Sequence, residues 1–260
     1  MRVRRLLRTG LLAVGMMALS LHLAGPAALG QDLHSDGWQL SVTPYFWFSG
    51  IEGDLTVRGN DVDVDAGFDD ILDVLDYGVQ VHVELQNGRW GLLVDPTFLA
   101  FSADDDQLDV LNADLETDLW IVEFGGFYRI VDALDEQGLP GAVDVLLGGR
   151  YWNMETELDI GPLNFESDND WVDPFIGLRW IVQLTDRLLV HIRGDVGGFA
   201  IYDDASEFTW NVYAGPAMKL SKNVTFVSGY RALGIDKEKG NSFEADLTFA
   251  GPQIGLHIQF

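Results

Sequence analysis

Polar and apolar residues alternate one for one over much of the chain beyond residue 36, as in strands that turn one face to an apolar environment. The final segment has the fullest alternation. One of its faces carries Thr248, Ala250, Pro252, Ile254, Leu256, Ile258 and Phe260, and the other carries Phe249, Gly251, Gln253, Gly255, His257 and Gln259. Ten such segments predict strands over about 37–50, 77–87, 90–102, 117–130, 141–155, 173–184, 188–201, 207–219, 223–235 and 244–260.

The connections between these segments form two sets. Asn87-Gly88 is typical of a two-residue hairpin turn, and the other connections of this set span 131–140, 185–187 and 221–223. The second set, mostly long and acidic, spans 51–76, 103–116, 156–172, 202–206 and 236–243. Short turns at one end, longer loops at the other and an even strand number predict an all-β, antiparallel transmembrane barrel of about ten strands. Eight or twelve strands are the alternatives, because 54–58 and 61–65 could form two further short strands.

The first long connection has a different periodicity. Its apolar residues Phe68, Ile71, Leu72 and Leu75 recur at helical spacing, which predicts one short helix over 68–76. The spacing leaves open whether this helix caps the lumen or lies on the rim.

The N-terminus predicts export. Four arginines and no acid lie within residues 1–8, an apolar run follows to about Leu23, and Ala28 and Gly30 fit a small-residue cleavage site. The run is shorter than the roughly 20 residues of a membrane-spanning helix. We therefore expect a signal peptide over 1–30 and a barrel domain over 31–260.

Composition narrows the candidate partners and chemistry. The chain has no cysteine, which excludes disulfides, thiolate metal sites and a cysteine nucleophile. Without the four signal-peptide arginines, 12 of the 16 basic residues remain against 41 acidic residues, a net charge of −29. Such a charge repels nucleic acid, so we expect no nucleic-acid partner, and no cofactor is indicated.

A soluble barrel with an apolar interior would show the same alternation of polar and apolar residues. The positions of the aromatic residues favour a membrane-spanning barrel instead. Aromatic residues of the apolar face cluster near both strand ends, as two membrane interfaces require. Those near the turns are Trp38, Trp90, Tyr128 and Phe260, and those near the loops are Phe48, Tyr77, Phe98, Trp120, Tyr151, Phe208 and Trp210. The polar face is also rich in glycine, for which a water-exposed face has no need.

The chain end resembles a known signature. Ile254, Leu256, Ile258 and the final Phe260 are similar to the C-terminal signal of Gram-negative outer-membrane barrels, which the barrel-assembly machinery reads. The mature chain, including residues 38–45 and 88–93, is also similar to a group of uncharacterised proteobacterial outer-membrane proteins. This resemblance implies folding by that machinery, location in the outer membrane and contact with its lipid and lipopolysaccharide. It implies no activity.

Strand parity places a set of charges on the inner face. The candidate lumen network consists of Arg150, Arg179, Arg193, Arg231, Glu84, Asp95, Glu123 and Asp195, with Arg129, Asp144, His82 and His191 pointing the same way. Gly148, Gly177 and Gly229 each precede an arginine by two residues, which leaves room on the lumen face for a neighbouring side chain. A packed, salt-bridged interior and an anion-selective pore both fit these residues, and similar numbers of acids and arginines favour the packed interior.

Catalytic and metal sites are weakly indicated. His82 has Glu84 two residues away on the same face, but no serine accompanies them, so we expect no enzyme. The acids of 61–65 lack the glycine and glutamate of a calcium loop, which leaves the metal site unknown. Acidic loops could still bridge weakly bound divalent cations to lipopolysaccharide.

The sequence therefore predicts an outer-membrane barrel with a structural or narrow small-solute or ion channel role. A binding or adhesion protein that uses its acidic outer loops is the alternative, and a hydrolase at the rim is the third hypothesis.

Overall fold

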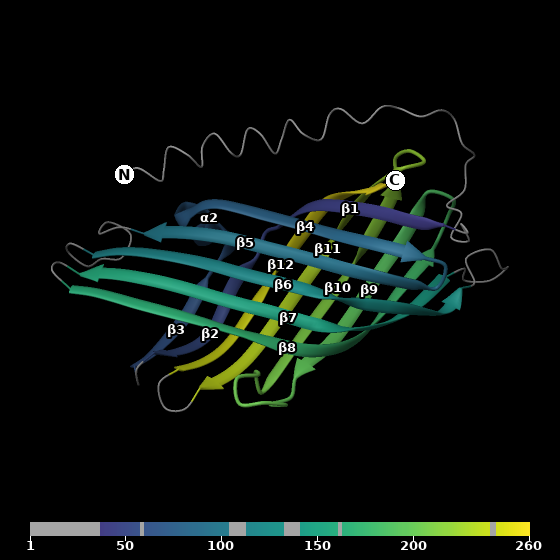
Figure 1. The fold of residues 1–260 in the computed structure, drawn as a ribbon. Coiled ribbons are helices and arrows are strands. Elements are labelled where there is room, and N and C mark those ends of the chain that lie inside the picture. The colour runs from purple at the N-terminus through teal and green to yellow at the C-terminus, as the bar shows by residue number, and fades with distance from the viewer. Residues whose placement is uncertain (1–36, 58–59, 104–112, 133–140, 161–162, 240–242) are drawn as a thin grey trace. The chain divides into compact units, whose positions relative to one another are not determined.

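The structure is a computed structural model that describes residues 37–57, 60–103, 113–132, 141–160, 163–239 and 243–260. These residues form twelve strands and one helix (Figure 1). The strands are β1 (Trp38–Trp47), β2 (Gly50–Val57), β3 (Asn60–Ala66), β4 (Leu75–Asn87), β5 (Trp90–Ala103), β6 (Ala113–Asp132), β7 (Gly141–Ile160), β8 (Leu163–Gln183), β9 (Leu188–Gly198), β10 (Phe208–Lys219), β11 (Val224–Lys239) and β12 (Phe243–Gln259), and the helix is α2 (Phe68–Val74).

Ten of these strands close into an antiparallel barrel. They pair in the order β1-β4-β5-β6-β7-β8-β9-β10-β11-β12, and β12 pairs with β1 to complete the ring. The two additional strands allowed by the sequence exist, but neither widens the ring. β2 pairs with the outer part of β12 and β3 pairs with β2, so the two form a hairpin added beside the ring. The prediction of a ten-stranded barrel is therefore confirmed.

Local sequence explains several boundaries. Gly88 has a φ of 56° in the turn between β4 and β5, which glycine adopts without strain. Helix α2 is two residues shorter than the expected 68–76 helix, because Leu75 already has extended backbone and begins β4.

The expected loop over 156–172 is wrong. β7 continues to Ile160 and β8 starts at Leu163, with Thr156 opposite Ser167 and Asn153 opposite Asp170. The acids in this segment had indicated a loop, yet Glu157, Asp168 and Asp170 are exposed on the outer faces of β7 and β8. β11 likewise extends to Lys239, into the expected loop over 236–243. The strands therefore run beyond the length that crosses a bilayer.

The two faces of the ring separate as the alternation predicts. On the inner face, Ser41, Tyr45 and Trp47 of β1 are buried, whereas Trp38 and Phe46 on the outer face are 63% and 66% exposed. The outer face of other strands carries further exposed large apolar residues, among them Trp90, Leu92, Leu147, Ile176, Leu178, Val212, Tyr230, Ile254, Leu256 and Phe260. This belt of exposed apolar side chains requires an apolar surrounding medium.

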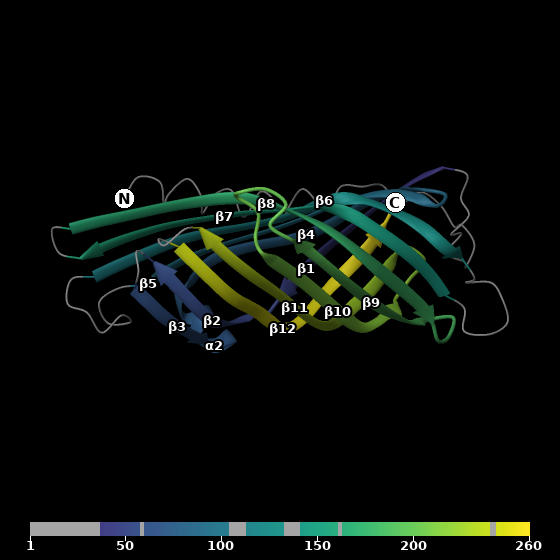
Figure 2. The same ribbon diagram turned by 90° about the horizontal axis from the view of Figure 1, so that it is seen from below.

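Towards the loop end, the wall divides into two sheets that face each other (Figure 2). β4 pairs with β1 only as far as Val81 and Pro44, and β8 pairs with β9 only as far as Phe175 and Gly197. Beyond these points β4–β8 form one sheet, and β11, β12, β2 and β3 form the other. Their inner faces share an apolar cluster that includes Trp152 and Phe249, whose ring centroids are 6.3 Å apart.

Two short segments lie at the edges of these sheets. On one side, the Phe68 ring of α2 packs edge-on against the ring of Phe48, with 5.0 Å between the ring centroids. On the other side, the loop after β9 is held to β8 by Ser206, whose backbone N–H and hydroxyl both donate to Asp173. Neither edge is closed by strand pairing.

The predicted signal peptide lies outside the described residues, as do 104–112 and 133–140. Over the described part of the chain, no helix is both long and apolar enough to cross a membrane.

Candidate functional site: the charged lumen

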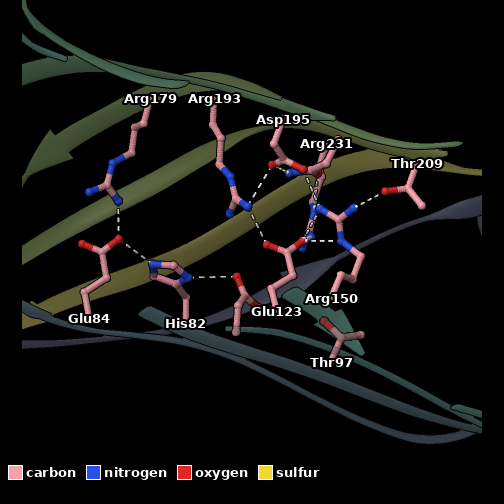
Figure 3. Close-up of polar contacts among 12 residues, drawn as sticks. His82, Glu84, Thr97, Glu123, Arg150, Arg179, Arg193, Asp195, Thr209 and Arg231 are labelled. Atoms are coloured by element: carbon pink, nitrogen blue, oxygen red, sulfur yellow. Dashed lines mark hydrogen bonds and ion pairs between the residues drawn. The ribbon is translucent and has the colours of Figure 1, made fainter. Parts of the chain in front are cut away.

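All eight residues of the predicted lumen network lie on the inner face of the ring, and hydrogen bonds and ion pairs join them. Figure 3 labels all of them except Asp95. They come from β4, β5, β6, β7, β8, β9 and β11, strands on all sides of the barrel. In Figure 3, Arg179 and Arg193 extend from one wall toward Glu84 and Glu123 on the other.

Glu123 is the centre of the larger half of the network. Its Oε1 accepts hydrogen bonds from Arg150 Nε at 3.2 Å and from Arg231 Nη2 at 2.7 Å, and its Oε2 accepts one from Arg193 Nη2 at 2.7 Å. β6 and β11 are five strands apart in a ring of ten, so the contact between Glu123 and Arg231 joins opposite walls. At this level the lumen is filled by side chains.

Asp195 completes this half. Its Oδ1 accepts from Arg150 Nη2 at 2.7 Å, and its Oδ2 accepts from Asn211 Nδ2 at 2.9 Å. Arg150 also donates to the Thr209 hydroxyl at 3.1 Å. Both Arg150 and Glu123 are wholly buried, where such charge-assisted bonds are strongest and an uncompensated charge is most costly.

The second half crosses the barrel closer to the turns. Asp144 accepts from both Arg129 and Arg179, and Arg179 reaches across to Glu84 on β4. The Arg179 guanidinium also lies 4.5 Å from the centre of the Phe127 ring. These contacts link β4, β6, β7 and β8.

His82 and Tyr45 connect the two halves. The His82 ring nitrogens lie 2.9 Å from Glu84 Oε1 and 2.9 Å from Asp95 Oδ2. Tyr45 donates its hydroxyl proton to Asp95 at 2.6 Å and accepts from Arg231 Nη1 at 3.3 Å. The charged groups of the lumen therefore form one continuous network rather than separate pairs.

Sequence reasoning missed the uncharged members of this network, namely Tyr45, Thr209 and Asn211. Their strand parity already placed them on the inner face, but nothing marked them as partners of particular arginines. Asp173 was missed as well: it holds Ser206 and accepts from the Trp171 indole N–H at 3.1 Å. Parity with Arg179 on the same strand could have identified Asp173 as inward.

The glycines that precede the arginines have the expected use. A Cβ on Gly148 would lie 2.8 Å from the Phe175 ring, and a Cβ on Gly229 would lie 2.8 Å from the Tyr213 ring. The Phe175 ring in turn lies 5.4 Å from the Arg150 guanidinium. Because Gly148 and Gly229 have no side chain, the rings of Phe175 and Tyr213 can lie against the barrel wall at these positions.

The network is electrically balanced. Its described members carry five guanidinium groups and five carboxylates, together with His82 between two of those carboxylates. A pore that selects anions would need guanidinium groups free to face the passing ion. Here carboxylates of the lumen, several of them on the opposite wall, occupy the guanidinium groups.

Among the described residues, no hydrogen bond joins a serine to a histidine. His82 is held by two carboxylates, and no serine of the described residues hydrogen-bonds to it. Ser206 bonds to Asp173 and Trp171 but to no histidine. A nucleophile, a base and an orienting acid are therefore not assembled in one place in this part of the chain.

The C-terminal residues lie on the outer face of the barrel. Ile254 and Leu256 of β12 and the following Phe260 are exposed, and Ile258 is partly exposed. The Phe260 backbone N–H donates to the Leu40 carbonyl at 2.8 Å, which fixes the chain end to β1. Recognition of this end by the assembly machinery stays a prediction.

Acidic residues line the outer faces of the two sheets. Asp236, Asp246, Asp54 and Asp63 lie in register across β11, β12, β2 and β3. On the other sheet, Asp118, Glu155 and Asp168 lie in register across β6, β7 and β8. Like charges directly opposite one another destabilise a sheet. Among the described residues, no group of three histidine, aspartate or glutamate side chains is arranged to hold a metal ion.

Together these features define an integral membrane barrel. A closed ring with apolar side chains outside and paired charges inside matches the outer-membrane class, and the protein is an outer-membrane β-barrel. No family model and no curated protein matches the chain.

Solved structures of outer-membrane proteins resemble it in fold. The outer membrane protease OmpT of Escherichia coli aligns with a TM-score of 0.55 at 7% identity, over 87% of this chain and 98% of that one. Neisserial surface protein A aligns at 0.36 and 12% identity, over 86% and 97% of the two chains. The attachment invasion locus protein Ail of Yersinia pestis aligns at 0.38 and 10% identity, over 87% and 100%. At these identities the likeness concerns the fold alone.

Proposed function

We propose that this protein is a closed, non-conducting barrel with a structural role, which holds its two acidic sheets at the outer surface of the membrane. The observation that carries the proposal is the contact between Glu123 and Arg231, which joins opposite walls at 2.7 Å. Ten strands enclose less space than the 16 or more of open porins, so paired side chains suffice to fill the lumen.

A narrow channel for small solutes or ions is less favoured than a closed barrel. It would require the balanced network to part during transport, and each buried charge would then lose its partner. The apolar cluster of the two sheets lies above the network and supports closure at a second level.

A binding or adhesion role is the second candidate, and the acidic rows favour it. Their outward carboxylates offer a cation-attracting surface of regular spacing. An enzymatic role has no comparable support, because His82 lies within the network rather than beside a nucleophile.

Liposome swelling tests closure toward uncharged solutes. Vesicles that contain the folded wild-type barrel should swell in arabinose or glycine no faster than vesicles without protein. A general porin reconstituted at the same protein-to-lipid ratio serves as the positive control. Swelling well above the empty-vesicle rate would overturn the closed-barrel proposal in favour of the small-solute channel.

Divalent cations and lipopolysaccharide are the proposed partners of the acidic sheets. Millimolar calcium should raise the melting temperature of the barrel by about 2–4 °C, which is the shift that roughly 1 kcal/mol gives in a chain of this size. Circular dichroism in detergent micelles measures it. The double variant D54N/D246N removes two carboxylates of one row and should lose much of the rise. An unchanged wild-type melting temperature with calcium would end the cation proposal.

A further inference from the structure

His82 lies between two carboxyl groups of the lumen network. Its Nε2 is 2.9 Å from Glu84 Oε1, and its Nδ1 is 2.9 Å from Asp95 Oδ2. Figure 3 shows a dashed line leaving each side of the ring. A neutral imidazole has one N–H donor, and its second nitrogen is an acceptor that a carboxylate oxygen would repel. The two contacts therefore require a doubly protonated ring, unless one of the two carboxyl groups carries the proton instead.

The other contacts of the two carboxyl groups indicate that both are ionised. Arg179 donates to the same Glu84 Oε1 that faces His82, and a guanidinium group pairs with a carboxylate rather than with a carboxylic acid. Asp95 Oδ1 accepts the hydroxyl proton of Tyr45 at 2.6 Å, a distance typical of a hydroxyl bonded to a charged carboxylate. The proton shared among the three groups therefore belongs on the His82 ring.

The other charged groups near His82 have partners of their own. Around His82 and its two carboxylates lie Glu123, Asp144, Arg179, Arg193 and Arg231, with Tyr45, His191 and His257 as the remaining titratable groups. Each of the three arginines is bonded to a carboxylate. Among the described residues, neither His191 nor His257 hydrogen-bonds to a carboxylate. His82 is therefore the histidine whose charge the network fixes.

We propose that His82 is an imidazolium at and well above neutral pH, and that its proton links the two halves of the lumen network. Glu84 belongs to the half nearer the turns, and Asp95 is joined to the half around Glu123 through Tyr45. When the ring loses this proton it can donate to only one of the two carboxylates, so one contact breaks and this link between the halves is lost. The device keeps the lumen locked at neutral pH and releases one link in alkaline solution. Its functional meaning rests on the closed-barrel proposal.

Nitrogen-15 NMR of the folded barrel in micelles reads the charge of His82 directly, because protonated and unprotonated ring nitrogens resonate in separate regions. At pH 8 an ordinary histidine, with a pKa of about 6.5, is roughly thirtyfold more often neutral than charged. Both ring nitrogens of His82 should still carry a proton at this pH, whereas free histidine in the same sample should be neutral. H82Q assigns the signals, and substitution of the other histidines by glutamine assigns them by elimination if H82Q fails to fold. One unprotonated ring nitrogen at pH 8 would overturn the proposal.

The same proton should make the stability of the barrel depend on pH. The unfolded chain gives up the His82 proton near pH 6.5, whereas the folded barrel retains it, so stability should fall as the pH rises above this value. Glutamine is of similar size and cannot carry the charge. The folding equilibrium constant of the wild type relative to that of H82Q should therefore fall by about five- to tenfold between pH 7.5 and 8.5. Urea unfolding in micelles measures both constants.

H191Q is the matched control, because His191 of β9 also faces the lumen but has no carboxylate partner among the described residues. The constant of the wild type relative to that of H191Q should be the same at both pH values. A ratio of wild type to H82Q that does not change with pH would overturn the proposal. Conduction at neutral pH would contradict closure of the lumen alone, whereas a neutral His82 would contradict only the proton link.

Discussion

Replacement of Glu123 by glutamine should destabilise the barrel by about 3–5 kcal/mol, the cost of removing one partner from a buried ion pair. Glutamine keeps the size of the side chain, and its carbonyl oxygen can still accept one hydrogen bond. It removes the negative charge that three arginines share, so Arg150, Arg193 and Arg231 would face one another with less compensation.

Urea unfolding of the refolded protein in micelles, followed by the change in gel mobility between folded and unfolded forms, measures this loss. Glu155 lies on the water-facing side of β7 and provides the matched control, since E155Q should change stability by no more than about 0.5 kcal/mol. Equal midpoints for E123Q and E155Q would contradict the assignment of Glu123 as the centre of the network.

Replacement of Gly215 by valine should have the second large effect. A Cβ at Gly215 would lie 1.9 Å from the Ser228 carbonyl oxygen and 2.3 Å from the Gly229 Cα, both on the adjoining strand. Because the obstacle is backbone, the side chain cannot be accommodated by a rotamer change. β10 and β11 would have to separate, at a cost of about 3 kcal/mol or a failure to fold.

Gly194 supplies the matched control for this substitution. It lies on the neighbouring strand β9, and a Cβ there would have no atom within 4 Å. Valine is favoured on a strand that faces lipid, so G194V should fold with at least the wild-type yield. Folding yields from urea into detergent compare the two variants, and equal yields would show that β10 and β11 do not approach as closely as described.

The inner and outer faces could be predicted from the sequence because a strand repeats every two residues. Once the alternation was recognised, Arg150, Arg231 and Glu123 had to share the lumen. Which of them meet could not be predicted. That depends on the tilt and stagger of the ring, which bring strands β6 and β11 into contact 108 residues apart.

The ends of the strands were predicted less well, for a physical reason. Beyond the membrane a strand needs no apolar outer face, so acids such as Glu155 and Asp168 replace the lipid-facing residues and imitate a loop. The inward residues Trp152 and Trp171 keep the alternation, and they were the available signal for the longer hairpin. The division of the wall into two sheets depends on where strand pairing stops, and no pattern in the local sequence indicates that point.

Recording the wild-type barrel in a planar lipid bilayer tests closure of the lumen most directly. The folded protein, inserted from detergent into a bilayer bathed in 1 M potassium chloride, should give no stepwise current above the bare-membrane baseline. Protease protection or antibody capture of the recorded membrane verifies that barrels are present. A silent membrane that contains barrels is the result predicted by the paired network of Glu123, Arg150, Arg193 and Arg231. Steady, ion-selective openings of uniform size would contradict it.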